Sequence, residues 1–218
     1  RHLIRRAYYD LTGLPPTFEA VEAFNAKNDQ RSAWDNLVNQ LLASERYGEK
    51  LASLWLDTVR YAETNGFERD NKKPYIWRYR DYVIKAFNDN KPYDRFVAEQ
   101  LAGDELPDSD VAAKVATGFM TLMQRDDEPA DRDQAHSDMI SDIVDVSSEA
   151  FLGTTMGCAK CHDHKVDPIP QADYYSLMSF FDSIGLSHLQ QPNRAWYDEA
   201  DARAREESAN ALAEAWAT

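Results

Sequence analysis

The two cysteines of the chain, Cys158 and Cys161, stand three positions apart, and His162 follows directly. The run Cys158-Ala159-Lys160-Cys161-His162 has the spacing by which haem c is attached to proteins. Two thiols at this spacing can add to the two vinyl groups of one porphyrin, and the next imidazole can then bind the iron. The motif therefore predicts one covalently attached haem c, fixed by both cysteines, with His162 as the proximal iron ligand.

Two other chemistries use cysteines at this spacing. A redox-active dithiol is expected within a βαβ unit, which the sequence does not predict. A zinc site could use Cys158, Cys161 and His164, but its fourth ligand would have to come from a distant segment. These alternatives and an accidental pairing stay open, and haem is the chemistry that we expect first.

The motif does not fix the sixth ligand of such a haem. The candidate donors are Met139, Met156, Met178, His136, His164 and His188. Met178 and Met139 are the expected ligands, because both lie on predicted helices that could fold over the haem. His164 is expected either to orient an axial ligand, as outer-shell groups do, or to bind a haem in a partner, or to cap its own loop. An axial Met would raise the reduction potential relative to an axial His.

Haem propionates need cationic or hydrogen-bonding partners. The candidate cations are Arg60, Arg78, Arg80, Arg125 and Lys165. We expect Arg60, Arg80 and Lys165 in this role. The alternative for each is an ordinary ion pair with one of the 38 acidic residues, since such pairs are common and weak at protein surfaces.

Calcium is a second expected cofactor. The acidic run at 125–128 and the pair Asp163 and Asp167 offer the hard oxygen ligands that calcium prefers. The spacing of an EF-hand is not present, so this expectation depends on the folded chain bringing the carboxylates together.

The elements that must hold these residues are helical. Apolar residues recur at intervals of three or four, and no segment alternates as a strand does. The predicted helices are 1–11, 17–28, 32–43, 45–62, 75–88, 92–102, 109–122, 131–152, 172–184 and 198–216. Residues 153–171 are expected to form a loop that carries the motif. We therefore predict an all-α, irregular multi-helix domain over residues 1–190, followed at 191–218 by an acidic, Ala-rich helix or a linker toward a missing downstream domain.

Composition and charge narrow the class of protein. The 218 residues are 43% hydrophobic and 28% charged, as in ordinary globular proteins. The net charge of −14 disfavours nucleic acid as a partner and favours a basic one, because a polyanion would be repelled. The sequence holds no run of about 18 apolar residues, so it predicts no membrane-spanning helix. The chain opens at Arg1, so we expect a fragment or a processed product, in which a missing signal peptide says nothing about the compartment.

Several runs of the sequence resemble the cytochrome-associated domain of unknown function that is found in planctomycete-type multidomain cytochromes. The runs are 10–16, 41–48, 55–62, 77–81, 86–88 with 92–94, 100–104, and 151–153 through 158–168 to 174–175. The most specific is Cys158-Ala-Lys-Cys-His-Asp-His-Lys-Val-Asp-Pro168, and the resemblance covers residues 1 to about 185.

The resemblance implies an exported protein, periplasmic or otherwise extracytoplasmic. It also implies a larger chain with a separate haem c domain upstream and an uncharacterised domain downstream. It supplies no reaction. We expect electron transfer to a redox partner protein or an adjacent haem domain. The alternatives are a haem-dependent oxidoreductase acting on an organic substrate such as a carbohydrate, and a metal-stabilised interaction module without haem.

Overall fold

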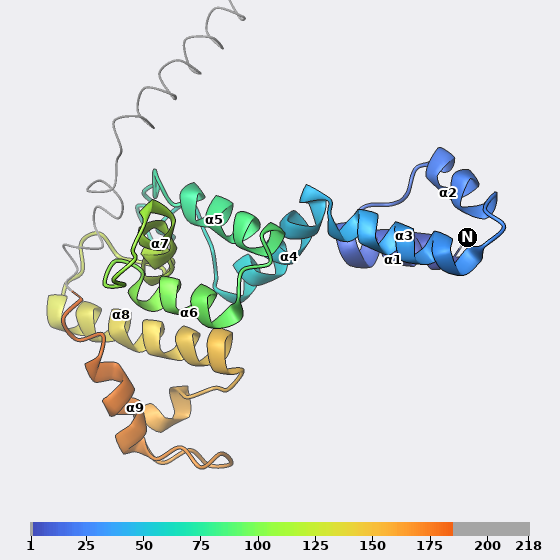
Figure 1. The fold of residues 1–218 in the computed structure, drawn as a ribbon. Helices are drawn as coiled ribbons and strands as arrows, with labels where there is room; N and C mark the ends of the chain where they lie inside the picture. Colours follow the sequence, from blue (N-terminus) through green and yellow to red (C-terminus); the bar gives the residue numbers. More distant parts are fainter. Residues whose placement is uncertain (1, 185–218) are drawn as a thin grey trace, which may run out of the picture.

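Residues 2–184 are described by the structure, a computed structural model, and they form an all-α fold (Figure 1). The α-helices are α1 (His2–Thr12), α2 (Phe18–Asn25), α3 (Gln30–Leu42), α4 (Glu45–Thr58), α5 (Trp77–Asn88), α6 (Tyr93–Ala102), α7 (Val111–Ala116), α8 (Arg132–Ser147) and α9 (Gln171–Ser179). Three shorter turns are η1 (Thr117–Thr121), η2 (Ser148–Leu152) and η3 (Gly157–Lys160). Within residues 2–184 the only β-type pairing is an isolated bridge between Thr64 and Lys72. The all-α prediction is confirmed.

Side-chain caps explain where five of these helices begin. Thr17, Asp29, Ser44, Asp110 and Asp131 each accept a hydrogen bond from a backbone N–H in the first turn of α2, α3, α4, α7 and α8. Such a cap satisfies one of the amides that a helix start leaves without an internal partner, and it stabilises the helix by about 1 kcal/mol. Polar residues that precede apolar periodic segments therefore set these boundaries.

Some predicted boundaries were wrong, and the backbone shows why. The helix predicted to reach Ala62 ends at Thr58, because Arg60 adopts a left-handed conformation with φ of 53°. The cap predicted at Ser109 is Asp110, while the hydroxyl of Ser109 donates to the carbonyl oxygen of Gly103. The helix predicted over 172–184 ends at Ser179. The predicted boundary near residue 190, the segment 191–218 and His188 lie outside the described residues.

Two hydrophobic cores hold the chain together. The small one joins α1 and α3 through Ile4, Ala7, Leu37 and Leu41. The large one, the main core, is built by α4 to α9 with the intervening turns. In Figure 1 the helices α1–α3 form an arm at one end, and α4 leads from that arm into the main body.

Helix α8 positions the cysteine motif. In Figure 1 it lies between the bundle of α4–α7 and a lower lobe, made of η3, the loop 161–170 and α9. The turn η3 packs against α9, and α9 also packs against α8. None of the helices within residues 2–184 is long and apolar enough to cross a membrane.

Candidate haem attachment site

The turn η3 places both thiols on one side of the backbone. Cys158 lies within this 3-10 turn and Cys161 is its C-terminal cap. Side chains three residues apart eclipse in a 3-10 helix, so the two cysteines share a face. Both are exposed and carry free thiols, whereas Ala159 between them is completely buried in the main core. The turn is therefore anchored by its alanine and presents its cysteines to solvent.

The imidazole of His162 is held in one orientation. It is exposed, and its Nδ1 lies 2.7 Å from the carbonyl oxygen of Asp163. A carbonyl oxygen only accepts, so Nδ1 must donate and therefore carries the proton. In the neutral ring Nε2 then holds the free lone pair, and this is the tautomer that binds a metal through Nε2.

Two side chains of α9 donate hydrogen bonds to the backbone of the motif. The hydroxyl of Tyr175 and Nε2 of Gln171 both donate to the carbonyl oxygen of Lys160, at 3.0 and 3.1 Å. They stand four residues apart in the helix and so lie on one face of it. From the sequence alone Gln171 is not singled out, and Tyr175 appears only as one of the residues that carry the family resemblance. The available signal was their i, i+4 spacing at the start of the helix that follows the motif loop.

The loop after the motif is closed by its own polar side chains. The carboxylate of Asp163 accepts the first amide of α9, at Gln171, at 2.8 Å. Nδ1 of His164 accepts the amide of Asp167 at 2.9 Å, and the His164 amide donates to the carbonyl oxygen of Ile169, also at 2.9 Å. Of the roles expected for His164, capping of its own loop is the one that these contacts support.

A half-buried carboxylate lies next to the motif. Asp145, on α8, faces Gly157, because a Cβ placed on that glycine would lie 3.4 Å from its Oδ2. Burial raises the pKa of Asp145, and the ammonium of Lys160 only partly opposes this. Burial also raises the pKa of the neighbouring Tyr174, and Asp145 adds to that shift. Within the described residues, neither Asp145 Oδ1 nor the Tyr174 hydroxyl makes a well-formed hydrogen bond.

The cations expected near the propionates lie in different places. Arg60 forms a two-point ion pair with Asp142 of α8, and burial lowers its pKa to about 10. Arg80 pairs with Glu63 and with its own neighbour Asp81. Lys165 is exposed in the loop that carries the motif. The structure thus brings Lys165 to the site and pairs the two arginines with carboxylates of their own.

The remaining expected cations are engaged elsewhere too. The guanidinium carbon of Arg78 lies 5.6 Å from the ring centre of Trp77. Arg125 pairs with Asp127 at 2.8 Å.

The carboxylates expected to bind calcium are not gathered. Asp127 also accepts hydrogen bonds from the amides of Asn65 and Asn71. In the part of the chain that the structure describes, no group of three or more His, Cys, Asp or Glu residues is arranged to hold a metal ion. This also applies to the zinc set of Cys158, Cys161 and His164. Calcium and zinc therefore find no preformed site within residues 2–184.

The expected sixth ligands lie mostly inside the protein. Met139 and Met156 are 4% and 7% exposed in the main core. Met178 is half-buried and packs against the same core. His136 lies with Nε2 3.1 Å from the carbonyl oxygen of Ile184.

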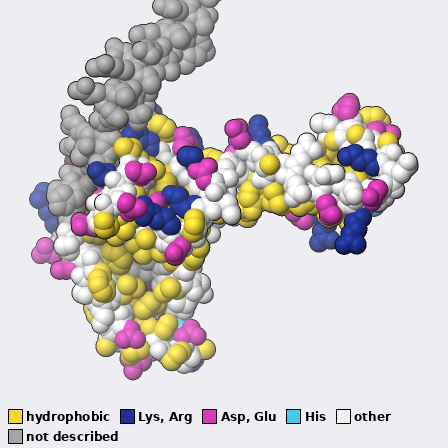
Figure 2. All heavy atoms as spheres, in the orientation of Figure 1, with side chains coloured by type: hydrophobic (Ala, Val, Ile, Leu, Met, Phe, Trp, Pro, Cys, Tyr) yellow, Lys and Arg dark blue, Asp and Glu magenta, His cyan; other side chains and the backbone are white. Residues whose placement is uncertain are grey.

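Large apolar side chains are exposed in the segments that flank the motif. They are Leu152, Val166, Tyr175 and Phe180, at 69%, 83%, 48% and 78% exposure. Figure 2 shows hydrophobic side chains on the lower lobe, with acidic groups at its lower edge. A porphyrin is largely apolar, so these side chains suit its binding. The thiol pair and the imidazole have the chemistry that covalent attachment of a haem requires, and exposed apolar side chains are available in the neighbouring segments.

Comparison with protein-family models matches residues 1–185 to the family described as PSCyt2, protein of unknown function (DUF1549). The match includes the cysteine motif and every element of the lower lobe. Searches of the curated proteins and of the solved structures each gave no match.

Proposed function

This chain belongs to the PSCyt2 family, described as proteins of unknown function (DUF1549), and from that premise we propose that it is a c-type cytochrome domain that transfers electrons through one covalently attached haem. The observation that carries the proposal is the arrangement of Cys158, Cys161 and His162. Two free thiols share one exposed face, and the adjacent imidazole offers an unprotonated Nε2.

Each residue of the site has a distinct role in this proposal. Cys158 and Cys161 would form the thioether bonds to the haem, and His162 would bind its iron through Nε2. The carbonyl of Asp163 fixes the orientation of that imidazole. Gln171 and Tyr175 hold the backbone of the motif, so that the three attachment points keep their relative positions. The haem, when bound, supplies the one-electron chemistry of iron.

The surroundings of the site support electron transfer with a protein partner. The motif is at the surface, so a haem attached there would have an accessible edge. The net charge of −14 would attract a basic redox partner and speed its encounter with this chain. The sequence resemblance implies an extracytoplasmic location and neighbouring domains in a longer chain. We propose a neighbouring haem domain as one candidate for the partner.

The experiment that tests the proposal is expression of the chain with a haem c assembly system, followed by intact mass and absorption spectra of both oxidation states. We expect one haem added to the mass, resistant to acid–acetone extraction, and a sharp α-band on reduction. The variant Cys158→Ser/Cys161→Ser is the matched control, since it keeps the size and exposure of the side chains. It should fold with the same helix content and carry no haem.

An unmodified mass from the wild-type chain, under conditions in which a known cytochrome c is matured, would contradict the proposal. Metal analysis of the same sample would then decide whether zinc or calcium is bound instead.

A further inference from the structure

The helix α1 is buried on one side and exposed on the other. It packs against α3 and α4, and its buried residues belong to the small core. Leu3, Arg6 and Tyr9 follow one another at intervals of three residues, so they form one row along the exposed side. Asp10 lies beside this row, four residues after Arg6. All four are exposed, Leu3 by 63% and Tyr9 by 40%, and we name these four residues the outer face of α1.

The charged groups of the outer face pair only loosely within α1. Nε of Arg6 lies 3.7 Å from Oδ2 of Asp10, and the two side chains are 81% and 67% exposed. An ion pair this exposed contributes little stability, so both groups are free to exchange it for a partner on another molecule. The guanidinium carbon of Arg5 lies 5.2 Å from the ring centre of Tyr9 and adds a second positive charge. The first half of α1 is therefore basic, whereas Asp10 near its end is acidic.

This order of charges is complementary to itself when two copies of the helix run antiparallel. About a twofold axis, Arg6 of one copy lies opposite Asp10 of the second, and the same pairing occurs in reverse. In this register Leu3 lies beside Leu14 of the second copy, a residue that is 49% exposed, and both Tyr9 side chains lie near the axis. A parallel arrangement would instead place like charges opposite each other, which is unfavourable.

The distribution of charge along the chain favours contact through the arm. Residues 2–44 carry four basic and five acidic side chains, a net charge of −1. Residues 45–184 carry 16 basic and 27 acidic side chains, a net charge of −11. Two copies therefore repel each other through their main bodies and least through their arms. Because the arm lies at one end of the molecule (Figure 1), contact between arms holds the two acidic bodies on opposite sides.

We propose that two copies of this chain associate through the outer face of α1, antiparallel about a twofold axis, with Arg6 of each copy paired with Asp10 of the other. No residue of the cysteine motif takes part, so the inference goes beyond the proposed function and does not rest on it. The contact is about one helix wide and belongs to the interfaces that bury less than about 1,200 Å² in total, which are weak. We therefore expect a dissociation constant on the order of 10 μM.

The test is sedimentation equilibrium of the full chain between about 1 and 300 μM, a range that brackets the expected constant. A reductant is present, so that disulfides between exposed thiols do not contribute. We expect a reversible monomer–dimer equilibrium. Arg6→Asp and Asp10→Arg should each weaken it by about 10-fold or more, since each variant places like charges opposite each other. The double variant Arg6→Asp/Asp10→Arg exchanges the charges in both copies and should restore the dimer.

Leu3→Ser should also weaken the dimer, because it removes an apolar contact at an exposed position that the fold of the monomer does not need. Val166→Ser, at a position that is 83% exposed in the lower lobe, is the matched control and should leave the dimer unchanged. Circular dichroism checks that each variant keeps its helix content. The helix itself tolerates both charge reversals, since Asp near the start of a helix and Arg near its end are favourable.

Three results would overturn the inference. One is a chain that stays monomeric over the whole concentration range. Another is a dimer that both single charge reversals leave unchanged, or that the double variant does not restore. The third is a dimer that Val166→Ser weakens and Leu3→Ser does not, which would place the contact on the lower lobe. Each of these results leaves the proposed attachment of haem untouched, and a chain without haem leaves this test valid.

Discussion

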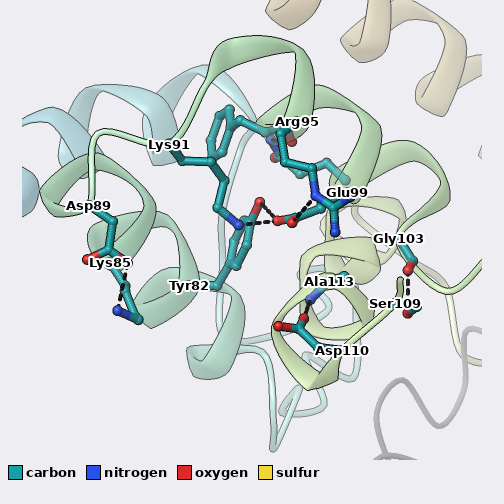
Figure 3. A network of polar contacts seen from close by, with 12 residues as sticks. Tyr82, Lys85, Asp89, Lys91, Arg95, Glu99, Gly103, Ser109, Asp110 and Ala113 are labelled. Carbon is teal, nitrogen blue, oxygen red and sulfur yellow. Dashed lines mark hydrogen bonds and ion pairs between the residues drawn. The ribbon is translucent and has the colours of Figure 1, made fainter. Parts of the chain in front are cut away.

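Two polar regions of the molecule differ in how completely their side chains are paired. The first lies in the main body, where Glu99 of α6 is 4% exposed. Its carboxylate accepts hydrogen bonds from Lys91, from Arg95 at 2.6 Å and from Tyr82 at 2.8 Å (Figure 3). The second is the run from Cys158 to His162, whose exposed thiols are free and whose exposed imidazole has one hydrogen bond, through Nδ1, among the described residues.

The pKa of Glu99 shows what pairing achieves. Burial alone would raise the pKa of this carboxyl, but the hydrogen bonds from Lys91, Arg95 and Tyr82 outweigh burial and hold the pKa below its ordinary value of 4.5. Arg95 is shared further with Asp108. Such a cluster of paired charges stabilises and orients the helices that carry it, and both oxygens of its carboxylate are engaged.

The cysteine motif is the opposite case. Its backbone is fixed by α9 and by buried Ala159, while, within residues 2–184, the two thiols are free and exposed. A site that must form new bonds needs rigid support and free reactive groups, which is what this region has. Four predictions test the contrast, and they are ordered by the size of the effect.

The largest effect is expected from His162→Ala, with His164→Ala as the matched variant two residues away. The first should keep the covalent haem and lose the proximal ligand, so the absorption and electron paramagnetic resonance spectra should change completely. The second should leave the ligation unchanged and cost about 1 kcal/mol of stability, since it removes the acceptor of the Asp167 amide. Equal spectral changes in both variants would refute the separate roles assigned to the two histidines.

Glu99→Gln should lower the free energy of unfolding by about 3 kcal/mol, because it leaves Lys91 and Arg95 without their shared charge in a buried setting. Haem attachment should not change. Since the folded-state pKa of Glu99 is lowered, its stabilisation is present above pH 4.5 and is lost as the pH falls through the folded-state pKa. The difference from wild type in urea denaturation should therefore shrink in acid. Glu105→Gln, at an exposed position, is the control. An equal loss of stability in that variant would show that the pairing of Glu99 does not account for the effect.

Asp163→Ala should cost about 1 kcal/mol, the usual value of a lost helix cap, because Gln171 loses the acceptor of its amide. It should also broaden the spectra of the attached haem, as α9 then holds the motif less firmly. Asp182→Ala, an exposed residue beyond the helix, serves as the control in thermal unfolding. Unchanged stability in Asp163→Ala would show that the hydrogen bond from the Gln171 amide to Asp163 does not stabilise the site.

Asp145→Asn should raise stability by about 0.5–1 kcal/mol at pH 7, since it removes a half-buried charge, one oxygen of which is buried without a well-formed hydrogen bond. The folded-state pKa of Asp145 is raised above 3.8. Its contribution is therefore fully present below pH 3.8 and is lost as the pH rises through the folded-state pKa. The gain should vanish in acid. Asp142→Asn, which breaks the ion pair with Arg60, should instead lower the stability of the protein. Equal effects of the two substitutions would contradict the different roles assigned to Asp142 and Asp145.

The helices could be predicted well from periodicity, but their ends depended on contacts that sequence patterns do not reveal. The helix over 131–152 was predicted as one piece. It becomes α8 followed by a π turn that ends at Gly153, where φ is 64° and a left-handed residue stops the helix. The end of α4 follows in the same way from Arg60, whose side chain reaches Asp142, 82 positions away in the sequence.

The sequence by itself determined the helical class and the cysteine–histidine motif, because both follow from the order and spacing of residues within one segment. Only the tertiary structure decided which way the thiols face and which donors remain free. Arg60 is paired across 82 positions, Met139 is taken into the main core, and Tyr175 is brought back to Lys160. These outcomes depend on which helices pack together, and packing between distant segments is set by the shape of the whole core rather than by any local pattern.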